Sequence, residues 1–109
     1  MMYVEFSAGD KEYKLRLTTR DIVALEKQLG CNPLAIFGNG DVMPTLTTMV
    51  QILHASMQSM HHGVTMSDAY TIFDDYLVDH SMTDFLAVIV EIYKVSGLIK
   101  KSELEAEKN

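Results

Sequence analysis

The first part of the chain alternates apolar and polar residues with a period of two, as half-buried strands do. The apolar positions of its two runs are Met2, Val4 and Phe6, then Tyr13, Leu15 and Leu17. Between the runs lie Gly9 and Asp10, which both tolerate the positive φ of a tight turn. The pattern therefore predicts a β-hairpin over about residues 2–17.

After the hairpin, apolar residues recur at helical spacing, and the segments are separated by caps and stops. Thr18 and Asp21 have the spacing of a capping box, and Gly30 offers a C-terminal stop, so we expect a first helix from about residue 19. Asn32 followed by Pro33 predicts a short helical turn over residues 34–37, which leads into a Gly-rich loop at 38–41.

Three longer helices are expected in the second half of the chain. One begins near Asp41 or Met43, with Pro44 in its first turn, and ends before residue 63. The next begins at Thr65, with Asp68 as its capping-box partner. The last begins at position 81 or 83 and ends at 97. With about 100° per residue, the expected buried stripes of the first two are Leu46, Met49, Val50, Leu53, Met57 and Met60, and then Ala69, Ile72, Phe73, Tyr76 and Leu77.

An isolated hairpin is marginally stable in water, so this one must lay its apolar face on the helices. The predicted fold is α+β: an N-terminal antiparallel β-hairpin packed on a small bundle of four to five short α-helices. We expect one domain over residues 1–99. Residues 100–109 are rich in charge and have no apolar stripe, which predicts a frayed or disordered tail that takes no part in partner binding.

The last helix is apolar on two faces. The first face holds Phe85, Val88, Ile89 and Ile92, and the second, roughly 100° away, holds Leu86, Val90 and Tyr93. Such a helix is either central in its bundle or meets a partner or a second copy of the chain. Eight methionines are a second unusual feature, because flexible Met side chains suit adaptable binding surfaces. Met43 and Met66 lie beside expected loops and join the candidate partner-binding residues.

Charge and composition narrow the possible partners and the compartment. The net charge of −6 and the nine scattered basic residues argue against a nucleic-acid partner, since phosphate contacts need clustered Lys and Arg. The chain shows no signal-peptide pattern, and its apolar runs are too short to span a bilayer. A lone Cys31 fits a reducing compartment. We therefore expect a soluble intracellular protein without a membrane partner.

The pattern of reactive residues argues against an enzyme. His54 and His61 are seven residues apart, too far along one helix to chelate a metal ion unaided. Asp68, Asp75 and Asp79 lie opposite an apolar stripe, as a solvated helix face does. Cys31 has no His or cationic neighbour in sequence that would activate its thiol. We expect no catalytic residues, no metal and no cofactor.

The order of these segments resembles the tail assembly chaperones of long-tailed bacteriophages and prophages. The resemblance extends over most of residues 3–99. It lies in the Gly-Asp turn, in residues 13–18, 21–30 and 32–34, in the helix start from Thr65 to Asp68, and in residues 96–98.

The resemblance implies a non-enzymatic factor that binds the tape measure protein and keeps it soluble in the host cytoplasm while the tail tube assembles. Such a factor is absent from the mature virion. In that family, a frameshifted C-terminal extension often engages the tail tube protein, and there is no active site to transfer. Two alternatives remain open: a small connector or morphogenesis protein built into the particle, and a prophage-encoded regulator that acts by protein contact.

Overall fold

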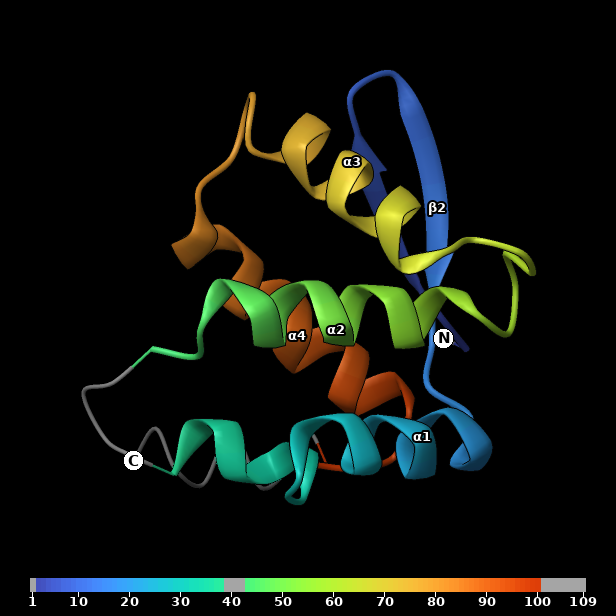
Figure 1. The fold of residues 1–109 in the computed structure, drawn as a ribbon, viewed down its shortest axis with the longest axis vertical. Helices are drawn as coiled ribbons and strands as arrows, with labels where there is room; N and C mark the ends of the chain where they lie inside the picture. Colours follow the sequence, from blue (N-terminus) through green and yellow to red (C-terminus); the bar gives the residue numbers. More distant parts are fainter. Residues whose placement is uncertain (1, 39–42, 101–109) are drawn as a thin grey trace.

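A computed structural model describes residues 2–38 and 43–100. It contains a hairpin, four α-helices and one short 3₁₀ helix, so the chain is an α+β protein (Figure 1). Its elements are β1 (Val4–Ala8), β2 (Lys11–Leu15), α1 (Thr19–Leu29), η1 (Pro33–Phe37), α2 (Leu46–Met57), α3 (Met66–Tyr76) and α4 (Met82–Val95). The expected tail beyond Lys100 and most of the expected loop, with the alternative helix start at Asp41, lie outside the described residues.

The hairpin is antiparallel, as expected, and closes through a two-residue turn. Ala8 pairs with Lys11, and Gly9 has a φ of 64° at the first turn position, where glycine relieves the strain of positive φ. Asp10 does not share that conformation. Beyond β2, the backbone N–H of Arg16 donates to the Ser56 carbonyl at 2.8 Å, and that of Leu17 donates to the Ser96 hydroxyl at 2.9 Å. These bonds hold the end of the hairpin against α2 and α4.

The helix starts agree closely with the sequence signals. Complete capping boxes begin α1 at Thr18, α3 at Thr65 and α4 at Ser81. Gly30 ends α1 at a φ of 74°, where its missing Cβ makes the left-handed conformation inexpensive. These local signals are strong because each cap satisfies backbone N–H groups that a helix start leaves without partners.

The expected start and stripe of α2 were wrong in part. The Thr45 side chain caps α2, which places Pro44 before the helix and not in its first turn. Leu46 and Met60 were expected to be buried but are 42% and 38% exposed. Leu46 is the first residue of the helix, and Met60 follows its last turn, so neither lies where α2 is covered by its neighbours.

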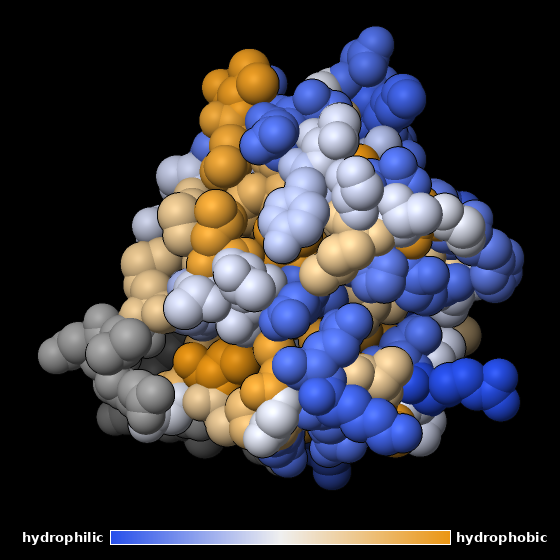
Figure 2. All heavy atoms as spheres, viewed as in Figure 1, coloured by the Kyte–Doolittle hydropathy of each residue, from blue (hydrophilic) through white to orange (hydrophobic). Residues whose placement is uncertain are grey.

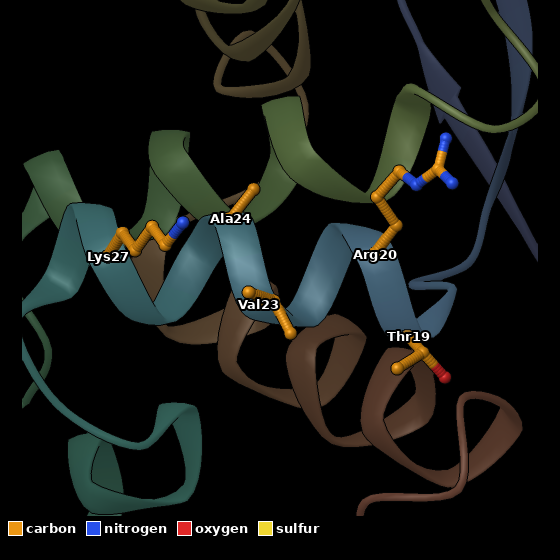
Figure 3. A pocket seen from close by; sticks show the side chains of 5 residues that line it. All are labelled: Thr19, Arg20, Val23, Ala24 and Lys27. Carbon is orange, nitrogen blue, oxygen red and sulfur yellow. The ribbon is translucent and has the colours of Figure 1, made fainter.

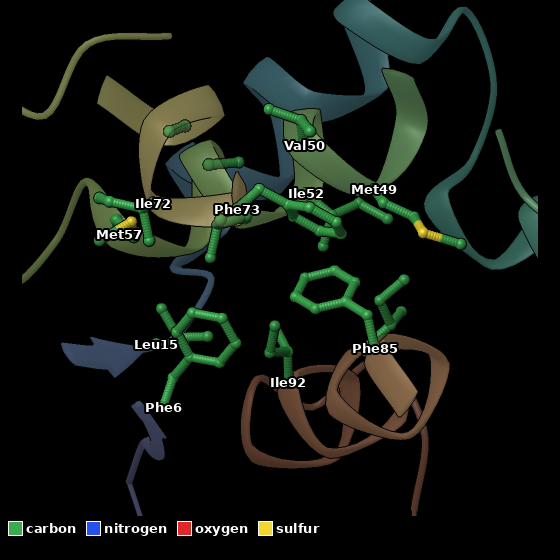
Figure 4. Close-up of a cluster of buried hydrophobic side chains, with 14 of the residues drawn as sticks. Phe6, Leu15, Met49, Val50, Ile52, Met57, Ile72, Phe73, Phe85 and Ile92 are labelled. Carbon is green, nitrogen blue, oxygen red and sulfur yellow. The ribbon is translucent and has the colours of Figure 1, made fainter. Parts of the chain in front are cut away.

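The core lies where the hairpin, α2, α3 and α4 meet (Figure 4). Phe6 of β1 stacks on Tyr76 of α3 with ring centroids 4.9 Å apart, and Phe73 meets Phe85 of α4 at the same distance. We call these four residues the aromatic cluster. α1 packs against α2 on the side away from α3 and adds Leu25 to the core. Within the described residues, every helix is too short or too polar to cross a membrane.

Candidate functional site

Of the nine large apolar residues that are exposed in the described part of the chain, four lie between residues 34 and 46. Leu34 and Phe37 of η1 are 37% and 41% exposed, and Met43 and Leu46 near the start of α2 are both 42% exposed. We call these four residues the apolar corner. η1 and the start of α2 lie on the same side of the molecule, and hydrophobic atoms gather over that side (Figures 1 and 2).

The η1 half of the apolar corner is held in place by its neighbours. The Asn32 side chain accepts a hydrogen bond from the Leu34 N–H at 2.9 Å, and Pro33 begins the helical turn. The Tyr93 hydroxyl of α4 donates to the Pro33 carbonyl at 2.9 Å. The Tyr93 ring also meets Phe37 edge-on, with centroids 5.9 Å apart. Leu34 and Phe37 are therefore presented from an anchored turn.

The α2 half is set by a helix start. The Thr45 hydroxyl accepts a hydrogen bond from the Thr48 N–H at 3.1 Å, so α2 begins with Leu46. A side chain at the first helical position lies before the turns of α2 that pack on α1 and α3. This is why Leu46 is exposed, whereas Met49 and Val50, one turn later, are buried.

The partner-binding residues proposed from the sequence differ in how exposed they are in the structure. Met43 is exposed and belongs to the apolar corner. Leu86 and Val90 are half-buried on α4. Met66 is half-buried at the first turn of α3 and packs against the core. Tyr93 was expected on a partner-binding face, and this expectation is wrong because Tyr93 is fully buried.

The burial of Tyr93 explains the second apolar face of α4. Its ring and hydroxyl are both engaged by η1, so part of that face is closed by the same chain. Burial raises the pKa of the Tyr93 hydroxyl, and the proximity of Cys31 adds to the rise. A neutral, hydrogen-bonded phenol suits a structural role. The central-helix interpretation therefore accounts for Tyr93, while Leu86 and Val90 keep part of their surface.

Sequence reasoning missed Leu34, Phe37 and Leu46 as surface residues. It treated η1 as a short apolar turn and placed Leu46 in a buried stripe. A signal was present in the sequence: apolar residues on both sides of a Gly-rich segment, next to helix ends, have few neighbours to cover them.

A second candidate surface is a shallow hollow of about 580 Å³ along α1 (Figure 3). Its lining comes from this helix alone: Thr19, Arg20, Val23, Ala24 and Lys27. Figure 3 shows these side chains spreading from the helix in different directions, without converging on one point. The lining of the hollow contains no carboxylate, imidazole or thiol.

His61 and Asp68 have structural partners. His61 accepts a hydrogen bond at Nε2 from the Lys14 backbone N–H at 2.8 Å, and its ring meets Tyr13. Asp68 caps α3, and hydrogen bonds from Thr65, from the backbone first and the side chain second, lower the pKa of its carboxyl. Cys31 is an exposed thiol. Among the described residues, no three His, Cys, Asp or Glu side chains are grouped in a way that could hold a metal ion.

Comparison with known proteins assigns the chain to a family and gives no function for it. No curated protein and no solved structure matched it. A family model matches residues 4–109, which includes the hairpin, the helices and the apolar corner. The chain therefore belongs to DUF6096, a family of unknown function.

Proposed function

We propose that this protein is a non-enzymatic tail assembly chaperone of a long-tailed bacteriophage or prophage, which binds the tape measure protein and keeps it soluble in the host cytoplasm. The proposal starts from the resemblance described above, in which the order of hairpin, caps and short helices is similar to that family. The observation that carries it is the apolar corner, four exposed apolar side chains on the anchored η1 turn and at the start of α2.

The chemistry of the apolar corner suits a helical client. A tape measure protein exposes long apolar helix faces before the tail tube covers it, and such faces are captured by apolar side chains arranged around a groove. Met43 adds a flexible side chain that adapts to different client residues. The net charge of −6 keeps a complex with an aggregation-prone partner in solution. Half-buried Val90 and Leu86 are proposed as secondary contacts, for the client or for a second copy.

Co-expression with the tape measure protein of the same phage or prophage tests the proposal. The wild-type chain should keep the tape measure protein in the soluble fraction and co-purify with it. The double variant Leu34→Ser, Leu46→Ser should lose both effects, because it removes two exposed apolar contacts without opening the core. Val78→Ser is the matched control, since Val78 is 78% exposed and lies outside the apolar corner.

Circular dichroism should show that all three proteins are folded. If the folded double variant still solubilises the tape measure protein as well as wild type does, the apolar corner is not the binding surface.

Mass spectrometry of purified virions gives a second test. A chaperone should be missing from the particles, whereas stoichiometric presence would identify the connector or structural protein that remains the alternative.

A further inference from the structure

The pairing of the hairpin determines which backbone groups face away from it. In an antiparallel pair, hydrogen-bonded residue pairs alternate with pairs whose N–H and C=O groups point outward. The outward groups of β2 are identified directly: the N–H of Lys14 donates to His61, and the next outward N–H, that of Arg16, donates to Ser56. Glu5 lies opposite Lys14, and Ser7 lies opposite Glu12, so Glu5 and Ser7 point outward from β1.

The two edges of the hairpin are therefore unequal. Part of the β2 edge is covered by Ser56, in the last turn of α2, and by His61, just beyond that helix. Within residues 2–38 and 43–100, the outward N–H and C=O groups of Glu5 and Ser7 have no hydrogen-bond partner. Both residues are exposed. An uncovered strand edge of this kind is a template for another strand.

The β1 edge borders a groove. The groove has a volume of about 470 Å³ and separates β1 from the N-terminal half of α4 and the end of α3. Its walls combine apolar and aromatic groups with two carboxylates; the residues used below are Tyr76, His80, Asp84, Ala87 and Val88. The His80 ring stacks on Tyr76 with centroids 4.4 Å apart, and this pair forms an aromatic end to the groove.

The charge of the groove indicates what it would bind. Glu5 faces it from β1 and Asp84 from α4. The cross-strand neighbour of Glu5 is Lys14, whose ammonium instead lies over the Tyr3 ring at 4.9 Å from its centroid. Burial raises the pKa of the Tyr76 hydroxyl, and the charge of Asp84 raises it further. The negative charge of Asp84 is therefore felt by a residue that lines the groove. Two copies of the chain would bring like charges together here.

We propose that the outer edge of β1 binds an extended, basic peptide segment of a partner protein by strand addition. The outward groups of Glu5 and Ser7 pair with the backbone of the segment. Alternate side chains of the segment lie against Ala87 and Val88, and its Lys or Arg side chains lie near Glu5 and Asp84. This site is separate from the apolar corner and does not depend on the chaperone proposal.

Two synthetic peptides test the proposal on the full chain. One alternates valine with lysine, and the other alternates valine with glutamate. The lysine peptide should bind more tightly by about tenfold or more, because it matches the charge of the groove. In the free protein the amide of Phe6, which pairs with Tyr13, should exchange slowly, and those of Glu5 and Ser7 should exchange fast. Added lysine peptide should slow the exchange of Glu5 and Ser7.

A pair of proline variants separates the two edges. Ser7→Pro removes an outward N–H from β1, and Glu12→Pro removes the matching one from its cross-strand neighbour on β2. Ser7→Pro should weaken binding of the lysine peptide by about tenfold or more, and Glu12→Pro should leave it unchanged. Should Ser7→Pro fail to fold, Glu5→Lys replaces it, because that variant keeps the edge and should weaken the preference for the lysine peptide by leaving Asp84 as the single carboxylate in the lining.

Several results would overturn the proposal. These are no binding of the lysine peptide, equal binding of both peptides, an unchanged exchange rate at Glu5 and Ser7, or a folded Ser7→Pro variant that binds like wild type. A loss of binding in Glu12→Pro alone would place the site on the opposite edge.

Discussion

The aromatic cluster and the apolar corner are made of the same kinds of side chain, yet only the first is closed on all sides. Phe73 is 2% exposed: Tyr76 of its own helix and Phe85 of α4 pack on its ring, and it belongs to a buried cluster that also includes residues of β1 and α2. Phe37 is 41% exposed, although its ring meets Tyr93 just as closely as Phe73 meets Tyr76. One good contact therefore does not bury a side chain; elements must arrive from several directions.

The two regions should therefore have different roles, one in stability and one in binding. Removing apolar area from water stabilises the fold in the aromatic cluster, where that area is already buried. The apolar corner still holds area that a partner would remove from water. Substitutions in the first region should act on stability, and substitutions in the second should act on binding.

The largest expected effect is that of Phe73→Ala in the aromatic cluster. Loss of a buried phenyl ring leaves a cavity beside Phe85 and Tyr76, which should lower the free energy of unfolding by about 3–5 kcal/mol. Urea denaturation followed by circular dichroism measures it. Val78→Ala is the exposed control and should change stability by less than about 0.5 kcal/mol. A loss under about 1 kcal/mol for Phe73→Ala would contradict the closed cluster.

Tyr93→Phe tests the link between the core and the apolar corner. The variant keeps the ring but removes the hydrogen bond from the Tyr93 hydroxyl to the Pro33 carbonyl, which should cost about 0.5–1.5 kcal/mol. Local amide exchange in η1 should become faster, because η1 loses its hydrogen bond to α4. If stability and exchange are unchanged, η1 is anchored by other contacts.

Alkaline pH gives a second measurement on the same residue. The folded-state pKa of Tyr93 is raised above the ordinary value of 10.0, so its contribution to stability is complete below that value and is lost as pH rises above it. The wild-type unfolding free energy should therefore fall above about pH 10. Tyr93→Phe should show a shallower fall, and identical pH profiles would contradict the assignment.

A smaller effect is expected at the start of α3. Thr65→Ala removes a capping hydroxyl and should cost about 1 kcal/mol. The lowered pKa of Asp68 means that its contribution is present above the ordinary value of 3.8 and is lost as pH falls through the folded-state value. Asp68→Asn should accordingly give a flatter stability profile at acid pH than wild type. Equal acid profiles would show that the capping carboxylate is not coupled to folding.

The smallest effect on stability is expected in the apolar corner. Leu46→Ser removes a side chain that is 42% exposed, so the free energy of unfolding should change by about 0.5 kcal/mol or less. Leu53→Ser, at a buried position two turns further along α2, is the contrast and should be strongly destabilising. A comparable loss from both variants would mean that the apolar corner is part of the core.

Much of the fold could be predicted because its signals are local. Alternation predicted the hairpin, and Thr18, Thr65 and Ser81 marked helix starts through side chains that cap their own backbone. The stripe of α3 was also correct at Ala69, Ile72, Phe73 and Tyr76, because a helix on the outside of a small domain buries one continuous face. The family match adds no function to these features.

The candidate site was harder to predict because exposure depends on distant segments. The sequence placed Tyr93 with Leu86 and Val90 on a partner-binding face, but η1, sixty residues earlier, buries Tyr93. It also placed Leu46 in the core, where helical spacing alone would put it. Periodicity indicates which residues share a face, but it does not indicate which other segment covers that face.

By itself, the sequence determined the α+β class, the hairpin and the helix starts set by caps, since each follows from interactions between residues close in the chain. Only the tertiary structure decided which apolar faces are closed. It brought η1 onto Tyr93 and placed the end of α2 on the β2 edge, and among residues 2–38 and 43–100 nothing covers the β1 edge or fully buries the apolar corner. The physical reason is that burial and edge coverage come from contacts between segments far apart in sequence, which no local pattern encodes.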